Sequence, residues 1–180
     1  MKTKFYFLKN VPSGGIDLSD WTYVIKNPWL KKNFSYAALG LQGFILLNSI
    51  AFGFWDFWKL YPLLWLAVFT VALHEVIHWA SVFFKGDVSF SLNGKLKIPG
   101  IRTNAVMSKV HYLLFTLLPF AVLTVIPFIL SAFIPDFGGG ILRFIAWVNF
   151  AASGADILRS VFIFAAPSKA KFCRGCYKVY

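Results

Sequence analysis

The sequence predicts an all-α polytopic membrane protein, with four transmembrane helices and a small β-hairpin on the cytoplasmic side. The chain has 180 residues, of which 58% are hydrophobic and only 14% are charged. A soluble domain of this size could not bury so much apolar surface. Four apolar runs are each close to or beyond the roughly 20 residues that cross a bilayer. A stretch of alternating polar and apolar residues lies between the second and third runs, which indicates the hairpin.

The predicted elements follow one another without a repeat, and we treat them as one membrane domain, 36–166. Its four predicted spans cover 36–54, 60–84, 110–134 and 141–166. Residues 1–35 form a cytoplasmic or interfacial segment in which Trp and Tyr stand among lysines, and 167–180 form a basic cytoplasmic tail. The connections after the first and third spans are nearly free of Lys and Arg, whereas the other segments outside the spans are rich in them. By the positive-inside rule, we expect a multi-pass protein of the cell membrane with both termini cytoplasmic.

The formal net charge of +11 indicates what the protein contacts outside its core. In a soluble protein this charge would suggest nucleic acid as a partner. Here the Lys and Arg residues cluster between and beyond the apolar runs, where anionic lipid headgroups lie. We therefore expect contact with the lipid bilayer and none with nucleic acid. The sequence does not indicate an oligomeric state.

The predicted hairpin covers residues 87–99. Val88 to Leu92 alternates, Asn93-Gly94 follows, and Lys95 to Ile98 alternates again before Pro99. This pattern is typical of two strands joined by a type I′ turn. Two roles remain open for it. It could be a connector packed on the lipid boundary, or its exposed edge could hold an extended substrate by strand addition.

The stretch with the clearest chemistry is His74-Glu75-Val76-Ile77-His78, within the second predicted span. Residues four apart share one face of a helix, so both imidazoles can bind one metal ion. Glu75 stands beside them, where it can handle the proton of a metal-bound water, and it is the only glutamate in the chain. The motif predicts a zinc site inside the membrane, with one zinc ion per chain.

The third ligand can be sought by elimination, because catalytic zinc usually takes three protein ligands and keeps one position for water. Glu75 and Asp156 are the only acids inside the four predicted spans. Counted from the outer ends of their spans, His74 and Asp156 lie at depths of roughly 20 Å and 22 Å at helical rise. Small residues precede Asp156 and allow close helix approach. We therefore predict His74, His78 and Asp156 as metal ligands, the alternative being that Asp156 only pairs with Arg159.

Four further polar side chains remain without a firm role. Asn149 lies two turns before Asp156 on the same helix face, where it could hydrogen-bond either a substrate carbonyl or a neighbouring helix. His111, at the start of the third span, is typical of a headgroup or backbone contact. Cys173 and Cys176 have the spacing of half a zinc knuckle or of a redox pair, but no second pair completes a site, and we leave them unassigned.

Together these residues resemble a known family. The His-Glu-x-x-His helix, the short β segment and a later span with Asn149 and Asp156 resemble the site-2 proteases, which are intramembrane zinc metalloproteases. The small size, the proline at position 119 and the string Ser153 to Ile157 are closer still to small, mostly bacterial zincin peptidases of the membrane. The resemblance implies His74, His78 and Asp156 as zinc ligands and Glu75 as the catalytic acid and base. Ala155 and Ile157 depart from the flanks usual in site-2 proteases, so the substrate is not implied.

The expected function is hydrolysis of a peptide bond in a membrane protein or peptide near the cytoplasmic face. Glu75 would deprotonate a zinc-bound water and pass the proton to the leaving amine. A non-proteolytic zinc carrier or sensor needs the ligands but not Glu75. A membrane scaffold with a metal-stabilised fold is the third class, and the sequence names no substrate.

Overall fold

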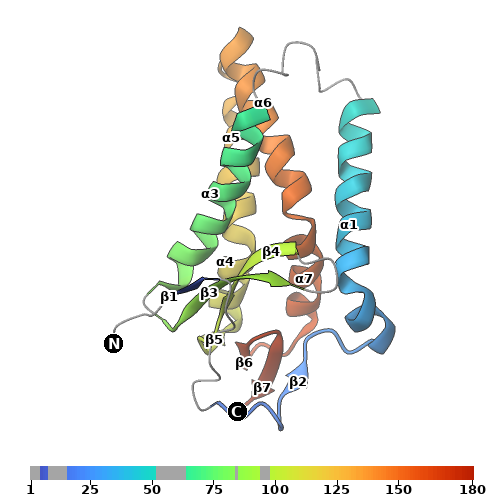
Figure 1. The fold of residues 1–180 in the computed structure, drawn as a ribbon, viewed down its shortest axis with the longest axis vertical. Helices are drawn as coiled ribbons and strands as arrows, with labels where there is room; N and C mark the ends of the chain where they lie inside the picture. Colours follow the sequence, from blue (N-terminus) through green and yellow to red (C-terminus); the bar gives the residue numbers. More distant parts are fainter. Residues whose placement is uncertain (1–4, 8–15, 52–63, 84, 94–97) are drawn as a thin grey trace.

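The computed structural model describes residues 5–7, 16–51, 64–83, 85–93 and 98–180, and most of them are helical. Figure 1 shows the helices side by side in a bundle, with the strands and the C-terminus gathered at one end. The helical elements are α1 (Pro28–Ala51), α3 (Leu64–Val82), α4 (Lys109–Phe120), the π-helical turn η2 (Ala121–Val125), α5 (Ile126–Leu130), α6 (Asp136–Ala152) and α7 (Gly154–Ala165).

Two helical runs in the described part of the chain are long and apolar enough to cross a membrane. They are α3 and the continuous run Lys109–Leu130, which joins α4, η2 and α5. A third span results if the bent pair α6 and α7 is counted as one. α1 has the length, 24 residues, but Lys31, Lys32 and Gln42 make it less apolar than α3. Its position as a fourth span stays a prediction.

The last predicted span, 141–166, is not one straight helix. The helix axis turns by 59° between α6 and α7. Ser153 sits at the break with φ −75° and ψ 0°, and its N–H still donates to the carbonyl of Asn149. Gly154 follows directly and begins α7. The bend points the first turn of α7, which carries Asp156, into the bundle.

The predicted hairpin is confirmed as a pair of antiparallel strands, with a different register. β3 (Val88–Asn93) pairs with β4 (Ile98–Thr103), and β1 (Phe5–Phe7) adds in parallel to the other side of β3. The sheet order is β1-β3-β4, so β4 is an edge strand. Asn93 pairs with Ile98, so four residues, 94–97, separate the two strands. The predicted two-residue turn is therefore wrong. These four residues lie outside the described part of the chain.

A second sheet was not predicted from the sequence. It has the order β2-β7-β6-β5, from Thr22–Tyr23, Cys176–Val179, Ala170–Cys173 and Met107–Ser108. The tail folds back on itself at Arg174 and Gly175, whose φ angles are 50° and 79°. Both values are those of a tight hairpin turn, for which glycine is suited. Phe172 of β6 is fully buried and stacks on Tyr112 of α4, which fixes this sheet to the bundle.

α1 is fixed to the bend between α6 and α7. The amide Nε2 of Gln42 donates to the carbonyl oxygen of Ala152 over 3.1 Å. At Gly154 there is no room for a side chain, since a Cβ would lie 2.7 Å from Cγ of Gln42 and 3.4 Å from the carbonyl oxygen of Ala38. By contrast, a Cβ added at Gly140, in α6, would have no atom within 4 Å.

We expect Gly154→Val to destabilise the protein because the new side chain pushes α1 away from the bend. The expected cost is about 1–3 kcal/mol, as for other overpacked contacts. Gly140→Ala is the matched control, and it should keep or slightly raise stability since alanine favours a helix. The measurement is the thermal unfolding midpoint of each purified protein in the same detergent. Equal midpoints for Gly154→Val and the unmodified protein would contradict the close contact.

Candidate metal centre

One face of α3 is buried along its whole length. Leu66, Thr70, His74, His78 and Val82 occupy this face at a spacing of four residues. The two histidines are 4% and 5% exposed. Buried polar groups require partners, so the surroundings of the two rings decide what they do.

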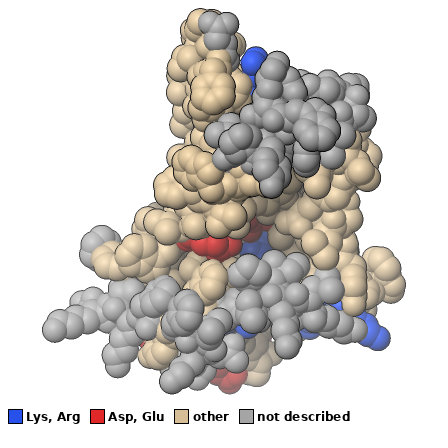
Figure 2. Space-filling view, turned by 45° about the horizontal axis from the view of Figure 1, so that its top comes forward, with Lys and Arg blue, Asp and Glu red and all other residues tan. Residues whose placement is uncertain are grey.

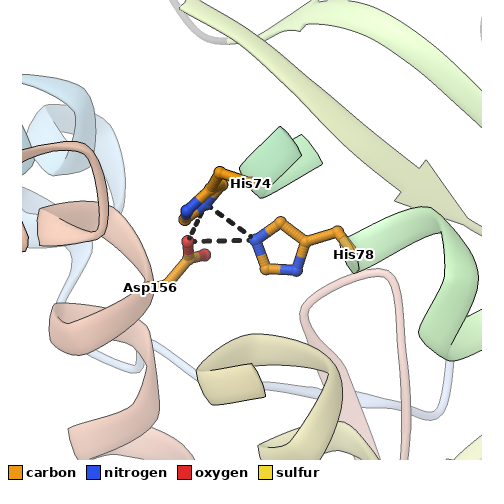
Figure 3. A group of neighbouring side chains, drawn as sticks. All are labelled: His74, His78 and Asp156. Atoms are coloured by element: carbon orange, nitrogen blue, oxygen red, sulfur yellow. Dashed lines mark hydrogen bonds and ion pairs between the residues drawn. The ribbon is translucent and has the colours of Figure 1, made fainter. Parts of the chain in front are cut away.

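Asp156 meets both histidines from the opposite side of the bundle. Its Oδ2 lies 3.2 Å from Nε2 of His74 and 3.1 Å from Nε2 of His78. The two Nε2 atoms are themselves 3.1 Å apart. Figure 3 shows the rings and the carboxylate pointing at one another, from α3 and the first turn of α7. The structure therefore brings together the three residues that the sequence predicts as ligands.

The other ring nitrogens determine where the protons are. Nδ1 of His78 lies 2.6 Å from the carbonyl oxygen of Phe115, which can only accept. Nδ1 of His74 lies 2.8 Å from Oδ1 of Asn149. The amide nitrogen of Asn149 donates elsewhere, to the carbonyl oxygen of Pro119 and to Oγ1 of Thr124. As neutral rings, both histidines therefore carry their single proton on Nδ1, which leaves Nε2 as an electron-pair donor.

This arrangement fits a metal ion. Two imidazole lone pairs and a carboxylate oxygen face one another in the bundle interior with no proton between them, which is repulsive until a cation lies among them. One ligand atom from each of the three residues lies within 4.8 Å of the other two, so together they could hold a metal ion. Ligands about 2.0–2.1 Å from a tetrahedral zinc lie roughly 3.3 Å apart, close to the separations found here. Nitrogen and oxygen donors of this kind suit zinc.

Glu75 lies beside the cluster and borders open space. A cleft of 610 Å³ is lined by α1, α3, β4, α4, α6 and α7, and His74, Glu75 and Asp156 border it. Figure 2 shows acidic and basic side chains exposed in this hollow, with the helices above it. The carboxylate Oε2 of Glu75 accepts a hydrogen bond from the backbone N–H of Ile101, in β4, over 3.0 Å. The hairpin that follows α3 thus folds back and contacts Glu75, the only acidic residue of α3.

The remaining sequence candidates separate clearly. Arg159 lines the cleft and its Nη1 lies 3.4 Å from Oδ1 of Asp156, so the aspartate faces the histidines with one oxygen and the arginine with the other. Asn149 is not one of the described residues that border this cleft. It is fully buried and makes the contacts with neighbouring helices described above. His111 is exposed at the start of α4, where its Nδ1 lies 3.0 Å from Oγ of Ser108.

The cysteine pair lies in the second sheet, outside the metal centre. Cys173 and Cys176 face each other across the β6–β7 turn as free, buried thiols. Burial raises the pKa of both thiols, which opposes thiolate formation. Together with Trp21 they form a small apolar cluster. Packing in this cluster accounts for their position.

Sequence reasoning missed the backbone groups that complete the site. The Phe115 carbonyl and the Ile101 N–H leave no trace in residue type, because each belongs to an ordinary apolar residue. One signal was present for the first of them. Pro119 stands four residues after Phe115 and has no N–H to bond its carbonyl.

Comparison with known proteins adds one finding. Residues 67–171, more than half of the chain, match a family described as "Putative zincin peptidase". No curated protein and no solved structure matches the chain. The matched residues include His74, Glu75, His78 and Asp156.

We expect the purified protein to bind one zinc ion per chain, and Asp156→Ala to weaken that binding by more than about 100-fold. That loss exceeds the 10–100-fold typical of a residue that only supports a ligand. The measurement is metal content by mass spectrometry together with a competition titration. His111→Ala is the matched control, since it removes the one histidine outside the cluster. Unchanged zinc affinity in Asp156→Ala would rule out the carboxylate as a ligand.

Proposed function

The chain belongs to the Putative zincin peptidase family, and we propose that it is an intramembrane zinc metallopeptidase similar to the site-2 proteases. It would cut a peptide bond of a membrane-associated protein or peptide near the cytoplasmic face. The observation that carries this proposal is the convergence of His74, His78 and Asp156 beside a carboxylate that borders a cleft. A metal that only stabilises a fold needs no such acid next to it.

The roles of the residues follow from their positions. His74, His78 and Asp156 would hold the zinc ion through the atoms that face one another. Zinc, when bound there, supplies a Lewis acid that polarises the scissile carbonyl and makes water more acidic. Glu75 accepts the proton of the attacking water and gives it to the leaving amine. Arg159, beside Asp156, balances the negative charge of that carboxylate.

The cleft offers a route for an extended peptide. β4 is the edge strand of its sheet, and its residues Gly100 and Ile101 border the cleft next to Glu75. A peptide that adds to this edge would run past the metal centre with its backbone bonded to the strand. A transmembrane helix would have to unwind locally to do so, since its backbone groups are otherwise bonded within the helix.

The placement in the membrane completes the proposal. We place residues 36–166 in the bilayer as four spans, with α1 as the first. Both sheets lie at one end of the bundle (Figure 1), the end where the basic segments 1–35 and 167–180 meet in the pairing of β2 with β7. We assign that end, with both termini, to the cytoplasm.

We expect Glu75→Gln to abolish cleavage while leaving zinc content unchanged. The amide keeps the size of the side chain but cannot accept a proton, and loss of a general base typically costs about 10²–10⁴-fold in rate. The measurement is a proteomic comparison of membrane fractions from cells with the unmodified or altered protein, in which the uncut substrate accumulates. Asp20→Asn, at an exposed ion pair with Lys178, is the control.

Two outcomes would decide against the peptidase. If zinc content is kept and no protein differs between the two strains, the protein is a zinc carrier, sensor or scaffold. If Glu75→Gln loses zinc as well, Glu75 contributes to metal binding and the assigned catalytic role is wrong.

We expect a green fluorescent protein fused after Tyr180 to fluoresce in bacterial cells, because it folds in the cytoplasm. Alkaline phosphatase inserted between α5 and α6, at residues 131–135, should be active, since that connection lies outside in the proposed orientation. The measurement compares both reporters at both positions. The reverse pattern would invert the orientation and place the cleft on the outer side.

A further inference from the structure

We propose that Pro119 and Asn149 are positioning residues that set the tautomer of the two histidines, Pro119 acting on His78 through its missing N–H and Asn149 acting on His74 through its Oδ1. This inference rests on the proposed zinc site and adds the residues that prepare it. It concerns the protons on Nδ1 of His78 and His74, which point away from the metal position. Neither proline nor asparagine would touch the metal or the substrate.

The contact behind His78 depends on the proline. In a regular helix, the carbonyl of Phe115 would accept a hydrogen bond from the N–H of the residue four positions later. That residue is Pro119, which lies inside α4 and has no N–H. The carbonyl of Phe115 is thereby left for Nδ1 of His78, at 2.6 Å, the shortest of the ring contacts in this cluster.

The contact behind His74 depends on the asparagine. Oδ1 of Asn149 lies 2.8 Å from Nδ1 of His74. The orientation of this amide is fixed, because its nitrogen reaches the carbonyl oxygen of Pro119 at 3.0 Å and Oγ1 of Thr124 at 2.9 Å. Thr124 belongs to the π-helical turn η2, an irregularity often found at functional sites. A flipped amide would set two acceptors, its own oxygen and the Pro119 carbonyl oxygen, against each other.

Both contacts therefore trace to the same short stretch of the third span, from Phe115 to Thr124. One proline releases an acceptor for His78, and its own carbonyl anchors the amide that serves His74. Groups that hold the second nitrogen of a ligand histidine fix the ring and make it a better ligand. The missing N–H of Pro119 concerns only His78 and Oδ1 of Asn149 concerns only His74, so a variant that changes one of these groups tests one ring.

The experiment uses the full chain in detergent, labelled with ¹⁵N only in histidine. The chain has three histidines, so the spectrum holds three rings, and His111 serves as an internal reference. A one-bond coupling between nitrogen and hydrogen shows which ring nitrogen is protonated. Zinc affinity is measured on the same samples by competition titration. The variants are Pro119→Ala, which restores the N–H at position 119, and Asn149→Leu, which removes the acceptor at similar size.

We expect the unmodified, zinc-loaded protein to show His74 and His78 protonated at Nδ1. Pro119→Ala should move or broaden the Nδ1 signal of His78 more than that of His74, and Asn149→Leu should do the reverse. Each should weaken zinc binding by roughly 10–100-fold, as for other supporting residues. Pro127→Ala and Asn48→Leu are matched controls, from α5 and from α1, and should leave both the signals and the affinity within twofold.

Asn149→Asp tests the acceptor directly. It keeps an oxygen opposite Nδ1 of His74, so it should restore the His74 signal and bind zinc more tightly than Asn149→Leu. Zinc affinity within twofold of the unmodified protein in both Pro119→Ala and Asn149→Leu would overturn the inference. Equal changes at both rings in either variant would also overturn it, since they indicate general loosening. Failure of the unmodified protein to bind zinc would instead overturn the proposed function.

Discussion

The mutual approach of His74, His78 and Asp156 is the constraint on which the rest of the structure depends. Their facing atoms are 3.1–3.2 Å apart, and two neutral rings protonated at Nδ1 put no proton between them. Such a cluster persists in a poorly solvated interior only if each group is held from behind. Asn149 and the Phe115 carbonyl hold the rings, and Arg159 holds the second carboxylate oxygen. A cation among the three then completes the site.

Helix irregularities supply the groups that hold the cluster. In hydrocarbon a backbone carbonyl without a partner is costly, so a helix break needs another donor nearby. At Pro119 the freed carbonyl of Phe115 meets a histidine ring. At the bend after α6 the carbonyl of Ala152 meets the side chain of Gln42 from α1. Each break therefore adds a polar link between two helices, and both links lie beside the candidate metal centre.

The bend at Ser153 has a further consequence for Asp156. It places the carboxylate in the first turn of α7, near the positive end of the helix dipole. An aspartate on a straight span would lack this stabilisation at the same depth. The short side chain reaches the histidines because the helix itself turns toward them.

The sequence predicted the convergence of His74, His78 and Asp156 better than the helices and strands around them. His74 and His78 followed from the i, i+4 spacing, and Asp156 from its depth and from the scarcity of acids, because charge inside a membrane is expensive. The bend at Ser153 was not predicted, since serine and glycine are also ordinary helix packing residues. The β6–β7 hairpin was hidden because its alternation is short and basic. Backbone partners such as Ile101 carry no sequence signal, so only coordinates show them.

The bond between Glu75 and Ile101 connects the chemistry to the cleft. On the proposed function, Glu75 must be free to accept a proton, and the outward N–H groups of β4 must be free to bind a peptide. In the structure one such N–H is bonded to Glu75, so the acid and the edge strand satisfy each other. A peptide that added to β4 would compete for that bond and would release the carboxylate toward the reacting bond. The base would then be freed only where a substrate backbone is present, which couples binding at the sheet edge to the chemistry at the metal.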